Sequence, residues 1–153
     1  MAYCFDTSAF LECWTRYYPP DIFPGLWDKL SDLAAYKQIV APEEVRRELE
    51  KQEDDLTLWV QQRPHIFVPL DSAVQTSVRE VLARHPFLVK ATSNRNQADP
   101  FVIAVARAEG LTVVTEEKGG TPTKPKIPSV CQDFNVRCVG VVQFIRDQGW
   151  TFS

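Results

Sequence analysis

The chain has 153 residues and a formal net charge of −3, with 44% hydrophobic and 24% charged residues. This length suits a single domain over residues 1–153, and the composition is that of a globular protein rather than a disordered one. The net charge excludes the basic surface of a general nucleic-acid binder, so any contact with nucleic acid must depend on a local patch or on bound cations.

The cysteines and the N-terminus indicate a cytoplasmic protein. The four cysteines include no CxxC pair, and the two histidines are not spaced to complete a zinc site. Cys4 and Cys138 lie in apolar runs and are expected to be small buried side chains, so a reduced compartment fits best. The N-terminal MAYCFDTSAF lacks the regions of a signal peptide, and no apolar run reaches the roughly 18–20 residues of a membrane helix.

The first half of the chain alternates short apolar runs with helical patterns. We expect, in order, a strand over residues 2–5, a helix over 8–17, a proline-rich connection over 18–24, a helix with apolar residues recurring from 26 to 34, and a strand at 39–40. Pro42 ends that strand and begins the clearest helix, because proline is tolerated and acids are favoured in a first turn. One apolar stripe predicts that this helix continues to about residue 59; it consists of Val45, Leu49, Leu56 and Trp59.

The second half continues the alternation. We expect a strand over 66–70, a helix capped at 71–72, a polar loop over 90–97, a nearly all-apolar helix over 99–109 stopped by Gly110, a strand over 111–115, a mobile Gly/Pro loop over 116–128, a helix over 129–134, a strand over 136–139 and a last helix to about 148. Strands separated by helices pair in parallel through right-handed crossovers. The sequence therefore predicts an α/β sandwich with helices on both faces of a parallel sheet.

Four acids lie where such a sheet would expose them. Asp6 comes directly after the first strand, and Glu117 follows the strand that ends at Thr115. Glu48 lies one turn into the helix after the second strand, and Asp99 begins the helix that leads to the next one. Because ligands of open parallel sheets bind outside the carboxyl ends of the strands, we expect these acids to form a common site.

Carboxylates gathered in one place repel one another unless a cation neutralises them, and a hard divalent ion such as Mg²⁺ or Mn²⁺ is the natural partner. One or two such ions can activate water and hold a scissile phosphate for in-line attack, which requires no catalytic His, Cys or Lys. Each acid also has a simpler interpretation: Asp6 and Asp99 as helix caps, Glu48 as part of a solvated helix face, and Glu116 and Glu117 as loop charges. Only their joint placement favours a metal site.

Five segments of the chain resemble those of the PIN-domain family, and in particular its DUF4411 branch, which is related to the VapC-type toxins. They are FDTSAF at 5–10, VAPEEVRREL at 40–49, ADPFVIAVA at 98–106, VVTEE at 113–117 and KIPSVCQDFNV at 126–136. They occur in family order over nearly the whole chain. The resemblance implies a PIN-like three-layer α/β/α sandwich with a central, mainly parallel five-stranded sheet.

The resemblance also implies a divalent-metal-dependent endoribonuclease that uses Mg²⁺ or Mn²⁺. Asp6 would be the first metal ligand, with Thr7 and Ser8 beside it as supporting polar groups. Asp99 would be the third acid of the site. The implied substrate is single-stranded or structured RNA.

The second and fourth acids each have a rival. The V-x-x-E-L pattern gives Glu48 as the second acid, and Glu44 lies one turn earlier on the same helix face. A T-x-acid pattern beginning at Thr115 gives Glu117 as the fourth, with Thr115 as a supporting group. Many family members have Asp at this position, so the longer Glu leaves Glu116 as an alternative.

Basic and aromatic side chains are candidates for contact with RNA. The basic ones are Lys118, Lys124 and Lys126 in the Gly/Pro loop, and Lys90 and Arg95 before the third acid. A solvated, flexible loop is the simpler interpretation of the lysines. The aromatic ones are Trp14, Tyr17 and Tyr18, which can stack on bases, although aromatic residues at a helix end more often belong to a core or an interface.

The resemblance also implies partners, and two other functions compete with the nuclease. The resemblance implies a toxin component with a cognate antitoxin protein, and self-association with Tyr17 and Phe23 as candidate contacts. One rival is a catalytically inactive PIN-like scaffold that binds RNA or protein, and the Glu at the fourth acid leaves room for it. The other is a phosphotransfer enzyme with Asp6 as nucleophile, although Ser8 stands where that class has a second Asp.

Overall fold

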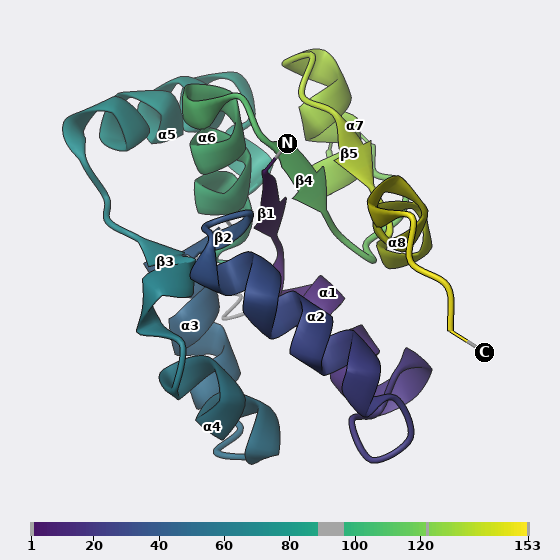
Figure 1. Cartoon of the computed structure of the whole chain (residues 1–153). Helices are drawn as coiled ribbons and strands as arrows, with labels where there is room; N and C mark the ends of the chain where they lie inside the picture. The colour runs from purple at the N-terminus through teal and green to yellow at the C-terminus, as the bar shows by residue number, and fades with distance from the viewer. Residues whose placement is uncertain (1, 89–96, 122, 153) are drawn as a thin grey trace.

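A computed structural model of the chain describes residues 2–88, 97–121 and 123–152 (Figure 1). The strands are β1 (Tyr3–Phe5), β2 (Ile39–Pro42), β3 (Phe67–Val68), β4 (Thr112–Val114) and β5 (Cys138–Val139). The α-helices are α1 (Thr7–Glu12), α2 (Pro24–Ala35), α3 (Glu43–Glu50), α4 (Asp55–Gln61), α5 (Ser72–Arg84), α6 (Asp99–Glu109), α7 (Ile127–Asp133) and α8 (Val141–Gln148). A π-helical stretch, Cys13–Tyr17, continues α1.

The strands form one five-stranded sheet in the order β3-β2-β1-β4-β5, and every strand pair in the described chain is parallel. The α/β class and the parallel five-stranded sheet expected from the sequence are confirmed. Since β1 is central and pairs with β2 and β4, the carboxyl ends of these strands meet at one edge. Segments far apart in the sequence are brought together at this edge.

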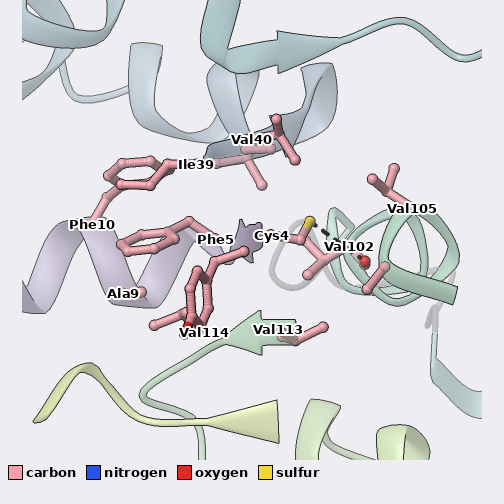
Figure 2. Close-up of a cluster of buried hydrophobic side chains, with 14 of the residues drawn as sticks. Cys4, Phe5, Ala9, Phe10, Ile39, Val40, Val102, Val105, Val113 and Val114 are labelled. Carbon is pink, nitrogen blue, oxygen red and sulfur yellow. Dashed lines mark hydrogen bonds between the residues drawn. The ribbon is translucent and has the colours of Figure 1, made fainter. Parts of the chain in front are cut away.

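Helices cover both faces of the sheet, and the side chains of β1 alternate between the two faces (Figure 2). Cys4 points to α6, where its thiol donates a hydrogen bond to the carbonyl of Val102 at 3.6 Å. Tyr3 and Phe5 point to the other face and contact the ring of Phe144 in α8 edge-to-face, with centroids 4.8 and 5.0 Å apart. Full burial of such side chains stabilises the fold by about 1.5–3 kcal/mol each. The result is the three-layer sandwich that the resemblance implied.

The predicted helix over residues 42–59 is wrong, because two helices, α3 and α4, occupy this segment. Glu53 has a φ of 45°, which a continuous helix does not permit. Asp54 then caps α4, and its Oδ1 accepts from the amide of Thr57 at 3.1 Å. Both helices bury residues of the predicted apolar stripe, since Val45, Leu49 and Leu56 are fully buried. The predicted apolar stripe is therefore mostly buried, but it extends over two helices instead of one.

Smaller differences concern element ends. The strand predicted over 66–70 contains only Phe67–Val68, because Pro64–Ile66 form a 3₁₀ turn. Helix α7 begins at Ile127, two residues earlier than predicted, so the last part of the predicted loop is helical. Lys90, Arg95 and all but Gln97 of the predicted polar loop lie outside the described residues. No helix in the described ranges is long and apolar enough to cross a membrane.

Candidate carboxylate metal site

Three of the expected acids come together at the carboxyl edge of the sheet. One carboxylate oxygen from each of Asp6, Asp99 and Glu117 lies within 4.8 Å of the others. Asp6 follows β1, Asp99 is the first residue of α6 and Glu117 follows β4. Three carboxylates from three segments thus offer oxygen ligands to one point, which is the donor set of a hard divalent cation.

Asp6 is held by two hydroxyl groups rather than serving as a helix cap. It occupies the N-cap position of α1, but its side chain makes no capping hydrogen bond. Instead, Ser8 Oγ and Thr115 Oγ1 both donate to Asp6 Oδ2, at 2.6 and 2.9 Å. Each hydroxyl in turn accepts a hydrogen bond from a backbone amide. Ser8 Oγ accepts from the amide of Glu116 at 3.0 Å, and Thr115 Oγ1 accepts from the amide of Glu117 at 3.1 Å. This chain of hydrogen bonds joins the end of β4 to the carboxylate after β1 and fixes one oxygen of Asp6.

Asp99 has an orphaned oxygen. Its side chain is only 3% exposed, and Oδ2 is buried without a hydrogen-bond partner in the described part of the chain. The N-cap of α6 is Ala98, so Asp99 is not the capping residue that the simpler interpretation made it. Buried polar atoms in native proteins are nearly always satisfied, and an exception calls for an explanation such as a bound ion, a water molecule or a catalytic role. This oxygen is the observation that most favours a cation.

Glu117 and Glu116, which the sequence left as alternatives, point to different places. Glu117 belongs to the carboxylate group, and its Oε2 accepts from the amide of Ile127, the first residue of α7, at 3.2 Å. Glu116 Oε1 instead accepts from the amide of Val141, the first residue of α8, at 2.7 Å. Glu117 therefore lies in the carboxylate group, whereas Glu116 is engaged by the start of a neighbouring helix.

Glu48 lies beside the group of three acids and is not a member of it. Its Oε1 accepts from the amide of Ala98 at 2.9 Å, which joins α3 to the start of α6, where Asp99 lies. The rival Glu44 pairs with Arg47 on the same helix, at 3.7 Å between Oε1 and Nη1. Among the described residues neither glutamate belongs to the group that could share one cation.

Burial and mutual repulsion change the acidity of the group. Burial, followed by the charge of Glu117, raises the pKa of Asp6 to about 6, although hydrogen bonds from Ser8 and Thr115 oppose the shift. Burial also raises the pKa of Asp99 well above its usual range, and the charges of Asp6, Glu117 and Glu48 add to this effect. A divalent cation would remove this cost, because it stabilises the ionised carboxylates.

The remaining candidates differ in their distance from the group. Lys126 lies close enough that its charge lowers the pKa of Asp99. Lys118 and Lys124 are exposed on the segment that joins β4 to α7. Thr7, expected as a supporting group, has a buried hydroxyl without a partner in the described chain.

The aromatic candidates for RNA contact mostly belong to the core. Trp14 packs edge-to-face on Trp27 at 4.7 Å between centroids, and Tyr18 packs on Phe23 at 5.3 Å. Tyr17 is 45% exposed.

The cysteines are all free thiols. Three are buried, but Cys138, which we expected to be buried, is only half-buried.

Sequence reasoning missed the helix N-termini as partners of the acids. The amides at the starts of α6, α7 and α8 bind Glu48, Glu117 and Glu116, respectively. Acids are favoured at helix N-termini, but these three lie on other elements, so no local capping pattern reveals them. The positions of the helix starts, which the sequence did contain, were the only available signal.

Fold and site together define a class: a parallel α/β protein with a carboxylate cluster at the carboxyl edge of its sheet. The chain belongs to the DUF4411 family, described as a domain of unknown function, whose match covers residues 3–152. No curated protein and no solved structure matches it significantly.

Proposed function

We propose that this protein is a divalent-metal-dependent endoribonuclease related to PIN domains. The observation that carries the proposal is the convergence of Asp6, Asp99 and Glu117 within 4.8 Å, with Asp99 Oδ2 buried and unpaired in the described structure. Without a cation, burial and the neighbouring charges raise the pKa of Asp99, so the acids could not all be ionised at neutral pH. The PIN-like segments of the sequence connect this donor set with hydrolysis of RNA.

In this proposal Asp6, Asp99 and Glu117 hold Mg²⁺ or Mn²⁺, and Glu48 supports the site from α3. A bound ion of this kind supplies an activated water molecule and neutralises charge on the phosphate. The chain's own groups position the carboxylates. Ser8 and Thr115 donate hydrogen bonds to Asp6 Oδ2, so the side chain of Asp6 keeps a fixed orientation. The amide of Ile127 does the same for Glu117 Oε2.

Lys118, Lys124 and Lys126 would bring the RNA backbone to the acids. All three lie between β4 and α7 or at its start, on the segment that carries Glu117. A net charge of −3 makes such a local patch necessary, since the molecule as a whole repels RNA.

The test is incubation of the purified protein with a mixed RNA pool in Mn²⁺, in Mg²⁺ and in EDTA. Asp6→Asn and Asp99→Asn are run beside the wild type after circular dichroism shows that they fold. We expect cleavage that needs the metal and disappears in both variants. No cleavage, together with no divalent binding by calorimetry, would instead favour the inactive scaffold.

We further propose that the protein is the toxin component of a toxin–antitoxin pair in the cytoplasm. The support is the similarity of the five segments to the VapC-related branch, and the antitoxin would cover the three carboxylates. Induced expression of the wild type should stop growth, whereas Asp99→Asn should not. Equal growth of both strains would contradict the toxin role and leave the nuclease proposal intact.

Self-association is the last part of the proposal. Tyr17 is exposed enough to contact a second copy, whereas Phe23 is half-buried against Tyr18. Sedimentation of the wild type and Tyr17→Ser tests it, and a dimer unaffected by Tyr17→Ser would place the interface elsewhere.

A further inference from the structure

A pocket of about 190 Å³ lies between the carboxyl ends of β4 and β5, next to the carboxylate group. Glu117 is a member of both, so the pocket continues from the point where the three acids meet. Its other lining residues are Thr115, Glu116, Lys118, Pro128, Cys138, Val139 and Gly140. The proposed hydrolysis of RNA assigns no role to this space.

The size and lining of the pocket restrict its occupant. Pockets that take a whole drug-sized molecule measure about 300–1,000 Å³, so this one suits a single ring system. Pro128, Val139 and Cys138 offer apolar surface to the face of such a ring. The carboxylates of Glu116 and Glu117 in the same lining accept hydrogen bonds from the amides that begin α8 and α7. Lys118 is the basic side chain of the lining, so the matching ligand combines a flat ring with a phosphate that this lysine can reach.

An unpaired base of single-stranded RNA has this combination of features. A base inside a duplex is stacked and paired, and only a splayed base can enter a side pocket. The backbone phosphate of the same nucleotide would then lie at the carboxylate group, because Glu117 joins the two places. An acidic peptide lacks the ring, and a polyphosphate offers no apolar surface.

We propose that the pocket between β4 and β5 binds one unpaired nucleobase of the RNA, next to the phosphate held at Asp6, Asp99 and Glu117. This inference rests on the proposed nuclease function, and it adds the site that selects single-stranded RNA. The apolar walls recognise the face of the base, so sequence preference at this position is weak.

Cys138 provides a direct measure of occupancy. It lines the pocket and is half-buried, whereas Cys4, Cys13 and Cys131 are buried. Iodoacetamide under reducing conditions should therefore label Cys138 first, which peptide mass spectrometry can locate. A base in the pocket would cover this thiol.

The probes are a single-stranded 2′-O-methyl oligonucleotide and an abasic oligonucleotide with the same backbone and charge. Both are added at saturating concentration, as measured by fluorescence anisotropy. We expect the base-bearing oligonucleotide to slow alkylation of Cys138 by about fivefold or more, which corresponds to the lower end of the free energy that stacking of one base contributes. The abasic oligonucleotide should have little effect. Equal protection by both, or bound oligonucleotide without protection, would overturn the base site.

A pair of variants tests the pocket independently of the labelling of Cys138. Gly140 has a φ of −84°, and a Cβ there would lie at ordinary contact distance, 3.4 Å from Glu116 Oε1 and 3.8 Å from the carbonyl of Thr115. Circular dichroism first establishes that the leucine variant folds. Gly140→Leu should weaken binding of the base-bearing oligonucleotide about fivefold or more and leave the abasic one unchanged. The matched control is Val142→Leu at an exposed position of α8, which should change neither. Equal weakening of both oligonucleotides by Gly140→Leu would contradict the proposal.

These results separate the base site from the nuclease function. Metal-dependent cleavage without protection of Cys138 would remove the base site alone. If neither oligonucleotide bound, both the base site and the RNA function would be lost. Protection of Cys138 in a protein that cleaves nothing would keep the base site and replace the nuclease by a binding protein.

Discussion

The acids of the site differ in which of their oxygens accept hydrogen bonds, and this decides what a substitution will reveal. Asp6 Oδ2 and Glu117 Oε2 accept hydrogen bonds, whereas Asp99 Oδ2 accepts none in the described structure. Glu48 is different, because its bond to the amide of Ala98 has a structural purpose of its own. The charge of Glu48 and its role as an acceptor can therefore be separated.

Glu48→Gln should preserve the stability of the fold, and Glu48→Ala should lower it. The amide oxygen of Gln can still accept from Ala98, whereas Ala leaves the N-terminal amide unpaired, at a cost of about 1–2 kcal/mol as for other lost helix caps. Urea unfolding of the two variants measures this difference. In calorimetric titration with Mn²⁺, Glu48→Gln should lose far less affinity than Asp99→Asn. If the two lost equal affinity, Glu48 would be a direct ligand.

Without a metal, stability should fall as pH rises. The pKa of Asp6 is raised to about 6 and that of Asp99 is raised further above its usual range, while in the unfolded chain both ionise near about 3.9. Between these values the native state binds more protons than the unfolded state, so the free energy of unfolding decreases with increasing pH. Thermal unfolding in EDTA from about pH 5 to about pH 8 should show this loss.

Asp99→Asn is the control for this pH dependence. An amide cannot ionise, so the variant should lose less stability over the same range and should be more stable than the wild type at the alkaline end. Asp147 does not interfere, because its hydrogen bond with Arg137 lowers its pKa to about 2. Parallel pH profiles for the wild type and Asp99→Asn would mean that the buried carboxyl is not the source of the effect.

At the scale of elements, the site depends on helix starts that meet at one edge of the sheet. The segment between β4 and α7 is the least regular of these connections, and it carries Glu117 and Lys126. Its Gly120 has a φ of 121°, and a Cβ there would lie 2.5 Å from Ser129 Oγ and 2.7 Å from the backbone nitrogen of Lys126. Only glycine permits this close approach to the start of α7.

Gly120→Ala should therefore destabilise the protein more than Gly119→Ala. Both glycines have positive φ, but a Cβ on Gly119 meets nothing within 4 Å. The substitution at Gly119 should cost about 1–2 kcal/mol for the left-handed conformation alone, and that at Gly120 about 1–3 kcal/mol more because of the clash. Chemical denaturation of the pair measures the difference. Equal losses would show that the segment shifts freely away from α7.

The features that could be predicted from the sequence are those marked by residues close to them in the chain. Helix α6 was predicted with both ends correct, because Asp99-Pro100 and Gly110 mark its limits within the chain. The break between α3 and α4 was missed because the apolar stripe continues through it, although Asp54 and Thr57 form a recognisable cap. The choice between Glu116 and Glu117 could not be made, because it depends on where α7 and α8 begin in space.

At the scale of the whole molecule, the strand order joins distant parts of the chain. Because β1 lies between β2 and β4, Asp6 reaches segments that follow it by about a hundred residues, as the described sheet shows (Figure 1). The three acids stand on a strand end, a helix start and a loop. A cation bound by all three would therefore tie the central strand to α6 and to the segment after β4.

Mn²⁺ or Mg²⁺ should consequently stabilise the native fold. A ligand present at 100 times its Kd and bound only by the native state adds about 2.7 kcal/mol to the free energy of unfolding. We expect the Tm of the wild type at about pH 7.5 to rise with each divalent ion and to return to its starting value in EDTA, since ionised carboxylates are required for binding. Asp99→Asn should show almost no rise, because it removes the unpaired buried oxygen. Ca²⁺ serves as a control for ion size, and Arg47→Gln, which leaves Glu44 without its ion pair, controls for surface charge. An equal rise in Tm in the wild type and in Asp99→Asn would show that the ions bind elsewhere, and the carboxylate cluster would then be a structural feature stabilised by its helix N-termini.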